Sequence, residues 1–219
     1  MSTQIVPPSP AAVPEMPLQE SVVSPAATPP ARPRRGKKQP LYLQHEELDR
    51  LFRVIHSVRD RALFRVAYHA GLRASEVGLL ELRDVDLHNE SIYIHRLKGS
   101  HSGVHFLVRE ESRALRAWLK VRGELPGPLF PTRLRTPIAR GRTLEMMHQY
   151  GAAAGLAPKL CHFHVLKHTC ATDLIERGFS IELVQNWLGH ANIQSTLIYT
   201  HITSPSRQRM AAELRETWR

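Results

Sequence analysis

The sequence predicts a mainly α-helical protein with one small antiparallel β-sheet, an α+β fold. The first observation is that apolar residues recur at three- and four-residue intervals through most of the chain after residue 44. The second is that apolar and polar residues alternate between residues 92 and 108, on either side of a glycine-containing turn. No segment repeats and no glycine-rich phosphate loop occurs, so nucleotide hydrolysis has no support.

Residues 1–40 differ from the rest of the chain in composition. They contain ten of the sixteen prolines and none of the thirteen histidines. A segment rich in Pro, Ala, Ser and Val without periodicity buries too little apolar surface to offset its ordering entropy. We expect a disordered tail over residues 1–40 and one globular domain over residues 41–219.

The tail ends in a cluster of basic residues: Arg32, Arg34, Arg35, Lys37 and Lys38. Such a cluster can form a flexible arm that contacts DNA phosphates beside the folded domain. It can equally be a solvated linker, and the sequence favours neither interpretation.

The chain as a whole is basic. It has 30 Lys and Arg against 20 Asp and Glu, a formal charge of +10, of which +3 (five basic, two acidic) lies in residues 1–40 and +7 (25 minus 18) in the remainder. A basic surplus points to a polyanionic partner, most often nucleic acid, although a basic protein without such a partner is the alternative.

The sequence gives no support for a membrane protein or a secreted protein. No apolar run is long enough for a membrane helix, and the N-terminus, with Glu15 and Glu20, does not resemble a signal peptide. Cys161 and Cys170 form neither a disulfide framework nor a paired-cysteine zinc site. We expect an intracellular protein in a reducing compartment.

Three helices are expected in the first part of the domain. The first starts at residue 44, where one apolar stripe contains Leu48, Leu51, Phe52 and Ile55. The second covers residues 60–70 and ends at Gly71, a typical C-cap residue. A short third helix is expected over Ala74–Leu80.

A β-hairpin follows, with Ile92 and Ile94 before the turn and Val104, Phe106 and Val108 after it. The remainder of the chain is expected to be helical over residues 110–122, 142–154, 163–177, 181–188, 193–200 and 205–217.

Two positions in this first half could carry chemistry. Arg73 precedes the expected short helix, where a guanidinium and free backbone N–H groups would meet a bound anion, and Glu76 can brace it. Lys98 lies where a strand enters the hairpin turn, a place from which an ammonium can reach a groove or an active site. Taken alone, either cation is a common surface residue.

The stretch CHFHVLKHTCAT, residues 161–172, holds a denser cluster. On a helix, His164, Lys167, His168 and Ala171 share one face, opposite an apolar stripe. A zinc site is disfavoured, because Val165 follows the first histidine where a zinc protease has glutamate, and because no cysteine pair is present. We expect no metal.

Two further residues stand near the C-terminus of the domain. His190 follows Gly189, which caps the expected helix at 181–188. Tyr199 lies nine residues later, near the end of a short helix, where a tyrosine is by default a packing residue.

Together these residues form an ordered series of five motifs: GLRASEVGLL, the hairpin Lys98, HVLKHTCAT, LGH and IYTH. The series, with its nine-residue step from His190 to Tyr199, resembles the catalytic domain of the tyrosine recombinase (phage integrase) family. The resemblance extends over nearly all of residues 41–219.

The resemblance implies a reaction. In that family a tyrosine hydroxyl attacks a DNA phosphodiester, forms a 3′-phosphotyrosine link and releases a 5′-hydroxyl, without ATP, metal or another cofactor. Tyr199 matches the nucleophile. Arg73 matches the first arginine, which neutralises charge on the non-bridging oxygens. Lys98 matches the general acid for the 5′-oxygen.

The remaining roles are implied in the same way. His164 matches the histidine that helps to move the tyrosine proton, and His190 matches the one that hydrogen-bonds a phosphate oxygen. Glu76 and His168 would support these residues.

The sequence departs from the family pattern at two points. Lys167 stands where the second arginine is expected, and it keeps the charge but loses the two-pronged grip on a phosphate. In addition, only the tail precedes the catalytic domain, so the chain resembles short members such as the fimbrial phase-variation invertases. We therefore expect modest, strongly salt-dependent affinity for an isolated site.

The expected partners are double-stranded DNA, further copies of the chain and DNA-bending accessory proteins. Met210, Leu214 and Trp218 give the last helix an apolar face. In the family such a helix often packs on a neighbouring protomer within a tetramer on synapsed DNA; packing against its own domain is the alternative. The resemblance implies a bacterial cytoplasmic protein associated with the nucleoid.

Site-specific recombination is the leading interpretation of these features. A second is a DNA-binding accessory or regulatory protein, catalytically weakened because of Lys167. A third is nicking and relaxing activity of the type IB topoisomerase kind, which would need no defined site or partner duplex.

Overall fold

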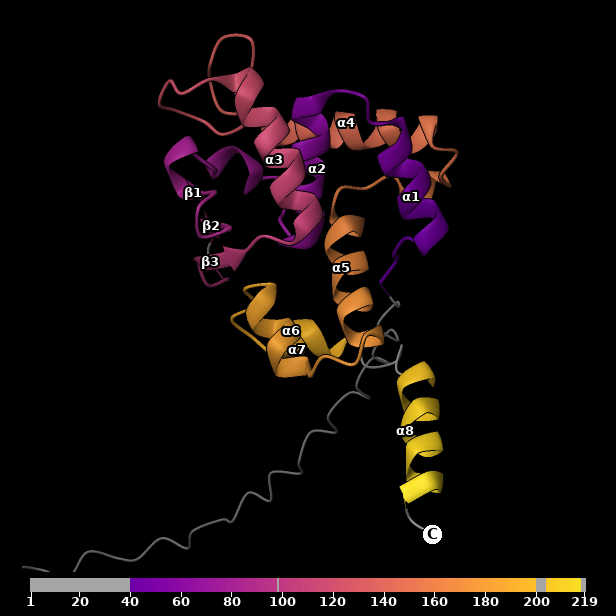
Figure 1. The fold of residues 1–219 in the computed structure, drawn as a ribbon. Helices are drawn as coiled ribbons and strands as arrows, with labels where there is room; N and C mark the ends of the chain where they lie inside the picture. Colours follow the sequence, from indigo (N-terminus) through magenta and orange to yellow (C-terminus); the bar gives the residue numbers. More distant parts are fainter. Residues whose placement is uncertain (1–39, 98, 200–203, 218–219) are drawn as a thin grey trace, which may run out of the picture. The chain divides into compact units, whose positions relative to one another are not determined.

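The structure is a computed structural model that describes residues 40–97, 99–199 and 204–217, with only the backbone of residues 204–210 (Figure 1). The described residues belong to one unit of the chain, Lys38–Arg219. Its longer helices are α1 (His45–Val54), α2 (Val58–His69), α3 (Arg109–Arg122), α4 (Arg140–Ala153), α5 (His164–Glu176), α6 (Ile181–Trp187), α7 (Gln194–Leu197) and α8 (Ser204–Thr217). Shorter elements are the 3₁₀ turns η1 (Val77–Leu79), η2 (Leu82–Asp84) and η3 (Pro158–Leu160) and the strands β1 (Val85–Asp86), β2 (Ser91–Ile94) and β3 (Gly103–Phe106).

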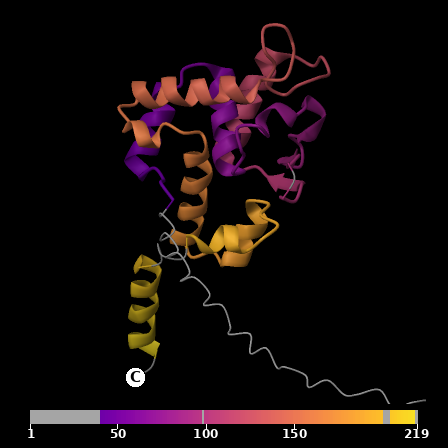
Figure 2. The ribbon, with the colours of Figure 1, turned by 180° about the vertical axis from the view of Figure 1, so that it is seen from behind.

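The predicted fold class is confirmed: helices dominate, and the strands form one antiparallel sheet in the order β1–β2–β3. Helix α2 packs against both α3 and α5, and α1 packs against α4. Seen from behind, α4 crosses the ends of α1 and α2 (Figure 2). Among the described residues, no helix combines the length and the apolar character needed to cross a bilayer.

Local chemistry explains where the first helices begin and end. Ser57 caps α2 by accepting a hydrogen bond from the backbone N–H of Asp60 at 3.3 Å. Gly71 ends the helix with φ +59°, and a Cβ there would lie 2.4 Å from Leu188 Cδ2. Glycine is therefore needed at this position both for its backbone conformation and for the close approach of Leu188.

The core is one cluster under these helices, and three aromatic rings mark its centre. Phe64 of α2 makes edge-to-face contacts with Tyr150 of α4 and with Phe163, which directly precedes α5, at centroid distances of 5.5 and 5.7 Å. Phe64 and Phe163 are fully buried, so α2, α4 and α5 hold one another in place.

The hairpin is confirmed, but its second strand faces the opposite way from the apolar pattern. Ile92 pairs with His105, so these two residues share the inward face and both are buried. Val104 and Phe106 are exposed instead, at 60% and 65%. His105 is accommodated because its Nε2 lies 3.0 Å from a carboxylate oxygen of Glu111, which is fully buried.

Two helix predictions were wrong in extent. The segment Ala74–Leu80 forms only the 3₁₀ turn η1, and the helix expected over residues 193–200 is reduced to α7. Val77 and Leu80 are both buried at a spacing of three residues, which a 3₁₀ turn satisfies as well as an α-helix does. The backbone N–H groups of Leu79 and Leu80 donate to the carbonyls of Glu76 and Val77, three residues earlier, as in a 3₁₀ turn.

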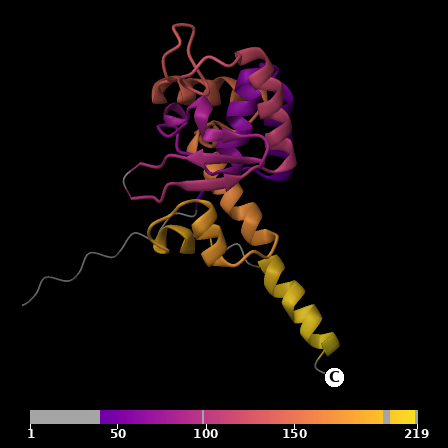
Figure 3. The same cartoon turned by 60° about the vertical axis from the view of Figure 1, so that its left-hand side comes forward.

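The hairpin lies over the segment that contains α6 and α7 (Figure 3). Ser100 forms an isolated antiparallel bridge with His190, and the backbone N–H of His101 donates to the carbonyl of Gly189 at 2.9 Å. This contact brings the hairpin turn and the LGH motif together, although 90 residues separate them in the sequence.

Candidate active site

The buried carboxylate of Glu76 organises one side of the site. It accepts hydrogen bonds from the backbone N–H of Arg73 at 2.9 Å and from Arg73 Nη1 at 2.8 Å. It also accepts from Arg96 Nη1 at 3.2 Å and from the backbone N–H of Leu97 at 3.4 Å. Burial alone would raise the pKa of Glu76, but the hydrogen bonds from Arg73 and the charge of Arg96 hold it below its usual value.

Arg73 presents a partly exposed guanidinium beside the hairpin. Its side chain is 34% exposed, and Nη1 also donates to Ser100 Oγ at 2.7 Å. Because Ser100 in turn pairs with His190, Arg73 is connected to the LGH motif through the hairpin. The sequence expectation that Glu76 can brace Arg73 agrees with this geometry.

Lys167 projects from α5 into the interior and does not face solvent. It is 1% exposed, and its Nζ donates to the carbonyl of Leu188 at 3.0 Å. Burial, together with the nearby charges of Arg96 and Arg73, lowers the pKa of Lys167 to about 7. The ammonium thus holds the end of α6 just before the turn at Gly189.

His190 and the turn before it are held on two sides. Gly189 has φ +65°, and a Cβ there would lie 2.7 Å from the carbonyl oxygen of His101. His190 Nδ1 lies 2.9 Å from Thr196 Oγ1, and burial lowers the pKa of His190 to about 3, with further lowering from the charges of Lys167, Arg73 and Arg96. His190 is therefore neutral at pH 7, with its Nδ1 in contact with Thr196.

Tyr199 is buried against α5. It is 1% exposed, and its hydroxyl lies 2.7 Å from His168 Nδ1. Burial raises the pKa of Tyr199 and lowers that of His168 to about 4, the latter with a contribution from His164 and Lys167. At pH 7 the pair is therefore a neutral phenol beside a neutral imidazole, and the phenol can donate its proton to the ring nitrogen.

His164 occupies the first turn of α5 and is exposed. Its ring lies 4.5 Å from the ring of His168, centroid to centroid, in an edge-to-face arrangement. Sequence reasoning gave His164 the direct role toward the tyrosine and His168 the supporting one, whereas in this structure it is His168 that contacts the Tyr199 hydroxyl.

The contacts of the predicted residues fall into two groups. Glu76 and Arg73 reach the LGH motif through Ser100, and Lys167 contacts the Leu188 carbonyl of the same motif. His168 contacts the Tyr199 hydroxyl, with His164 beside it. Lys98 and the basic cluster Arg32, Arg34, Arg35, Lys37 and Lys38 lie outside the described residues, as do the side chain of Met210 and the residue Trp218. Sequence reasoning missed Arg96. Its position two residues before Lys98 offered a hint, but nothing in the spacing indicated that it is buried.

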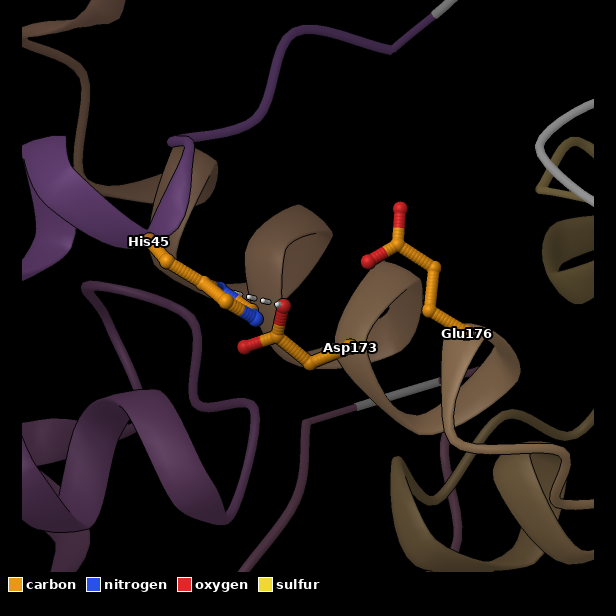
Figure 4. Close-up of side chains that lie close together, drawn as sticks. All are labelled: His45, Asp173 and Glu176. Atoms are coloured by element: carbon orange, nitrogen blue, oxygen red, sulfur yellow. Dashed lines mark ion pairs between the residues drawn. The ribbon is translucent and has the colours of Figure 1, made fainter. Parts of the chain in front are cut away.

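One group of side chains in the described part of the chain has the composition of a metal site. His45, Asp173 and Glu176 each place one potential ligand atom within 4.8 Å of the others (Figure 4). Asp173 already accepts a hydrogen bond from the Tyr68 hydroxyl and lies 3.7 Å from His45 Nδ1. These contacts account for the group as a polar connection between α1 and α5, and the prediction of no metal stays a prediction.

Comparison with known proteins identifies the fold. Solved structures with a similar fold include the XerA recombinase, with a TM-score of 0.70 and 30% identity over 86% of this chain and 67% of that one. They also include the XerH site-specific recombinase bound to a palindromic difH substrate, with a TM-score of 0.67 and 27% identity over 82% of this chain and 54% of that one. The fold is that of a tyrosine recombinase, a class of enzymes that recombine DNA.

The family follows from the sequence comparisons. Residues 42–205 match the model of the phage integrase family. The type 1 fimbriae regulatory protein FimB of Escherichia coli K12 is 35% identical over 167 residues, which cover 73% of this chain and 83% of FimB. The chain belongs to the phage integrase family. The matches support DNA recombination, and they do not support the interpretation as an accessory protein without efficient chemistry.

Proposed function

We propose that this chain recombines DNA through a covalent link between Tyr199 and a 3′-phosphate. The observation that carries the proposal is that Arg73 and Lys167 lie near His190 while the Tyr199 hydroxyl contacts a neutral imidazole. Basic side chains for charge neutralisation and an imidazole that can take the phenol proton match the needs of phosphoryl transfer.

In the proposed cleavage step, the Tyr199 oxygen forms a bond to phosphorus and the bond from phosphorus to the 5′-oxygen breaks. The proton of the phenol passes to His168, whose Nδ1 already lies at hydrogen-bond distance, with His164 beside it. Lys98 supplies a proton to the 5′-oxygen. The reverse step, with the 5′-hydroxyl of another strand as the attacking group, rejoins the DNA and releases Tyr199.

Arg73 and His190 are proposed to bind the non-bridging oxygens. Arg73 suits this role because its guanidinium is partly exposed while Glu76 fixes its base. Lys167 is proposed to hold the Leu188 carbonyl and to add positive charge to the phosphate site from its buried position. Tyr199 is almost fully buried, so its hydroxyl must move outward to reach a phosphate when DNA binds.

The test is capture of the covalent intermediate. The DNA is a duplex selected by binding from a random-sequence library, nicked near the centre so that the cleaved fragment diffuses away. A denaturing gel is expected to show a slow protein–DNA band that is lost in Tyr199→Phe. Retention of the band in Tyr199→Phe would contradict the proposal. Lys167→Arg is run alongside, and a band seen with that variant alone would identify lysine as the limiting residue. Relaxation of plasmids without the selected site would favour the topoisomerase interpretation.

We also propose that the active form is a homo-oligomer on synapsed DNA, joined by α8. A pocket of about 820 Å³ opens between α1, α2, the start of α3, α5 and α6. Its lining includes Leu48, Leu174 and Trp187, and Phe179 and Leu183 at its edge are 51% and 60% exposed. The proposed occupant is α8 of a second copy, because Met210, Leu214 and Trp218 form an apolar stripe at four-residue spacing.

Mass photometry of the protein on the selected duplex tests this assembly. Phe179→Asp and Leu183→Asp are expected to reduce the complex from a tetramer to smaller species. Leu134→Asp, at an 85% exposed position that does not line the pocket, is the matched control. A tetramer that survives both pocket variants would contradict docking of α8 at this pocket.

We place the protein at the bacterial nucleoid in the cytoplasm, where its DNA substrate is found. DNA-bending proteins are proposed to assist synapsis, and addition of such a protein to the recombination assay is expected to raise the yield on linear duplexes.

A further inference from the structure

We infer that Arg96 is a positioning residue that keeps the charge of Arg73 available to the DNA phosphate. The inference rests on the function proposed above, because it deals with the same site. Arg96 lies at the end of the hairpin's first arm, just after β2, and its side chain is 3% exposed. A guanidinium buried to this degree is costly unless its hydrogen bonds are satisfied.

The contacts of Arg96 join separate parts of the site. Nη1 donates to the carbonyl of Gly71 at 3.0 Å and to Glu76 at 3.2 Å, and Nη2 donates to the carbonyl of Ala70 at 2.5 Å. A Cβ on Gly189 would lie 3.0 Å from Arg96 Nε. Arg96 therefore fills the space between the end of α2 and the Gly189 turn, and it attaches the hairpin to both.

Arg96 acts on Arg73 through the carboxylate of Glu76. The two carboxylate oxygens are divided: Oε1 accepts from Arg73 Nη1, and Oε2 accepts from the Arg96 guanidinium and from the Arg73 backbone. Because Arg96 occupies Oε2 from the interior, the Arg73 guanidinium has only Oε1. Its other side-chain nitrogens stay available to a phosphate.

Loss of Arg96 would change this division. With Oε2 released, Glu76 can form a two-pronged ion pair with Arg73, which is the geometry that guanidinium and carboxylate prefer. That pair would neutralise the charge that Arg73 offers to the phosphate. A single buried carboxylate shared by two arginines thus leaves a net positive charge at the site.

Lys167 makes this arrangement more important. In this structure Lys167 Nζ points at the Leu188 carbonyl, and its lowered pKa leaves it only partly charged at pH 7. Arg73 is therefore the partly exposed guanidinium on which neutralisation of the phosphate depends in the described part of the site. Its orientation depends on Glu76 and, through Glu76, on Arg96.

The experiment compares two substrates that differ in one charge. The selected nicked duplex is prepared with a normal scissile phosphate and with a methylphosphonate, in which an uncharged methyl group replaces one non-bridging oxygen. The measured quantities are the single-turnover rate of the Tyr199–DNA link, the DNA dissociation constant and the melting temperature. The variants are Arg96→Gln, Arg96→Lys, Arg73→Gln and the double variant Arg73→Gln with Arg96→Gln. The control is Arg116→Gln, which removes an exposed guanidinium that donates to the Leu87 carbonyl.

On the normal phosphate, Arg96→Gln is expected to slow cleavage by roughly 10- to 100-fold, somewhat less than direct loss of a transition-state donor. The DNA dissociation constant is expected to stay within about twofold, since the Arg96 side chain is only 3% exposed. On the methylphosphonate, most of this defect should disappear. The double variant should be no slower than Arg73→Gln alone, because both substitutions remove the same interaction. Arg96→Lys should fall between the natural chain and Arg96→Gln.

The inference would be overturned if Arg96→Gln slowed cleavage equally on the normal phosphate and the methylphosphonate. It would also be overturned if the rate losses of Arg73→Gln and Arg96→Gln multiplied in the double variant. An unchanged rate in Arg96→Gln would do the same. If Arg96→Gln melts at too low a temperature to assay, Arg96→Lys decides by the same two-substrate comparison. A natural chain that forms no Tyr199-dependent link would instead overturn the proposed function, so the two failures are distinguishable.

Discussion

At the scale of single residues, the orientation of a side chain decides its role as much as its chemical type does. Sequence reasoning identified Lys167 as a departure from the family pattern, but it could not show that the ammonium turns inward to the Leu188 carbonyl. Its environment, with burial and two arginines, lowers its pKa to about 7. The folded protein therefore releases a proton that the unfolded chain holds up to the ordinary lysine range.

This difference predicts a pH-dependent stability. Between about pH 7 and 10 the unfolded state binds more protons at Lys167 than the folded state does, so the free energy of unfolding rises with pH. Lys167→Met removes this contribution. Urea unfolding at pH 7 and at pH 9.5 should show that the stability of the natural chain relative to Lys167→Met increases at the higher pH. A constant difference would mean that Lys167 is charged throughout.

His69 gives a pH dependence of the same sign, at lower pH. Burial, with the charge of Arg65, lowers the pKa of His69 to about 3, and its Nε2 is a buried atom without a hydrogen-bond partner in the described part of the chain. The unfolded state therefore takes up a proton below about pH 6.5 and the folded state does not, so stability falls as the pH decreases. His69→Leu should be more stable than the natural chain at pH 5 and should differ less at pH 7, as measured by thermal unfolding. A variant of the exposed His88 to Leu controls for a general effect of losing a histidine. If the stability of His69→Leu fell as steeply between pH 7 and 5 as that of the natural chain, His69 would not be the source of this pH dependence.

The catalytic candidates were predictable from residue order, whereas their partners were not. Arg73, His190 and Tyr199 lie in recognisable motifs along the chain. Arg96 lies two residues before Lys98 and reads as an ordinary surface arginine, because its acceptors come from the end of α2 and from Glu76. The contact of His168 with the Tyr199 hydroxyl likewise depends on how α7 meets α5, which no spacing rule provides.

At the scale of elements, glycine turns decide where the helices stop. Gly71 was predicted to end α2, and Gly189 to end α6, from their positions alone. The 3₁₀ turn η1 was not predictable, because its apolar spacing also fits an α-helix. The inverted second strand was not predictable either, since a buried His105–Glu111 pair replaces the expected apolar residues.

Two glycines allow a matched test of this view. Gly178 and Gly189 both have positive φ, at +90° and +65°, but a Cβ on Gly178 meets open space whereas one on Gly189 meets the His101 carbonyl at 2.7 Å. Gly178→Ala should cost about 1 kcal/mol of stability from the backbone conformation alone. Gly189→Ala should cost at least ~2 kcal/mol more, because it also displaces the hairpin. Chemical denaturation measures both, and equal losses would show that the hairpin contact contributes nothing.

At the scale of the whole molecule, charge governs how the protein meets DNA. The sequence carries a formal charge of +10, with +3 in residues 1–40. Each phosphate neutralised by a lysine or arginine steepens the salt dependence of binding by about one unit in a plot of log K against log salt. Residues 1–40 lie almost entirely outside the described part of the chain, so their role is a matter for solution measurement.

Deletion of residues 1–38 tests whether the basic cluster forms an arm on the DNA. If it does, the deletion should reduce the salt slope by about one unit for each lost phosphate contact and weaken binding uniformly across sequences. Fluorescence anisotropy at several salt concentrations measures the slope. Replacement of the five basic residues by Gln in the full chain separates charge from length. An unchanged slope in both would identify the segment as a solvated linker.

The pairing of Ser100 with His190 also bears on protein engineering. Backbone hydrogen bonds join the hairpin turn to the Gly189 turn, so the two segments form one interlocked unit despite their distance in sequence. A chimera that takes its hairpin from a relative must also take that relative's turn at the position of Gly189. Otherwise the backbones of the two segments do not match. When either segment is exchanged between relatives, the two are therefore best transplanted as a pair.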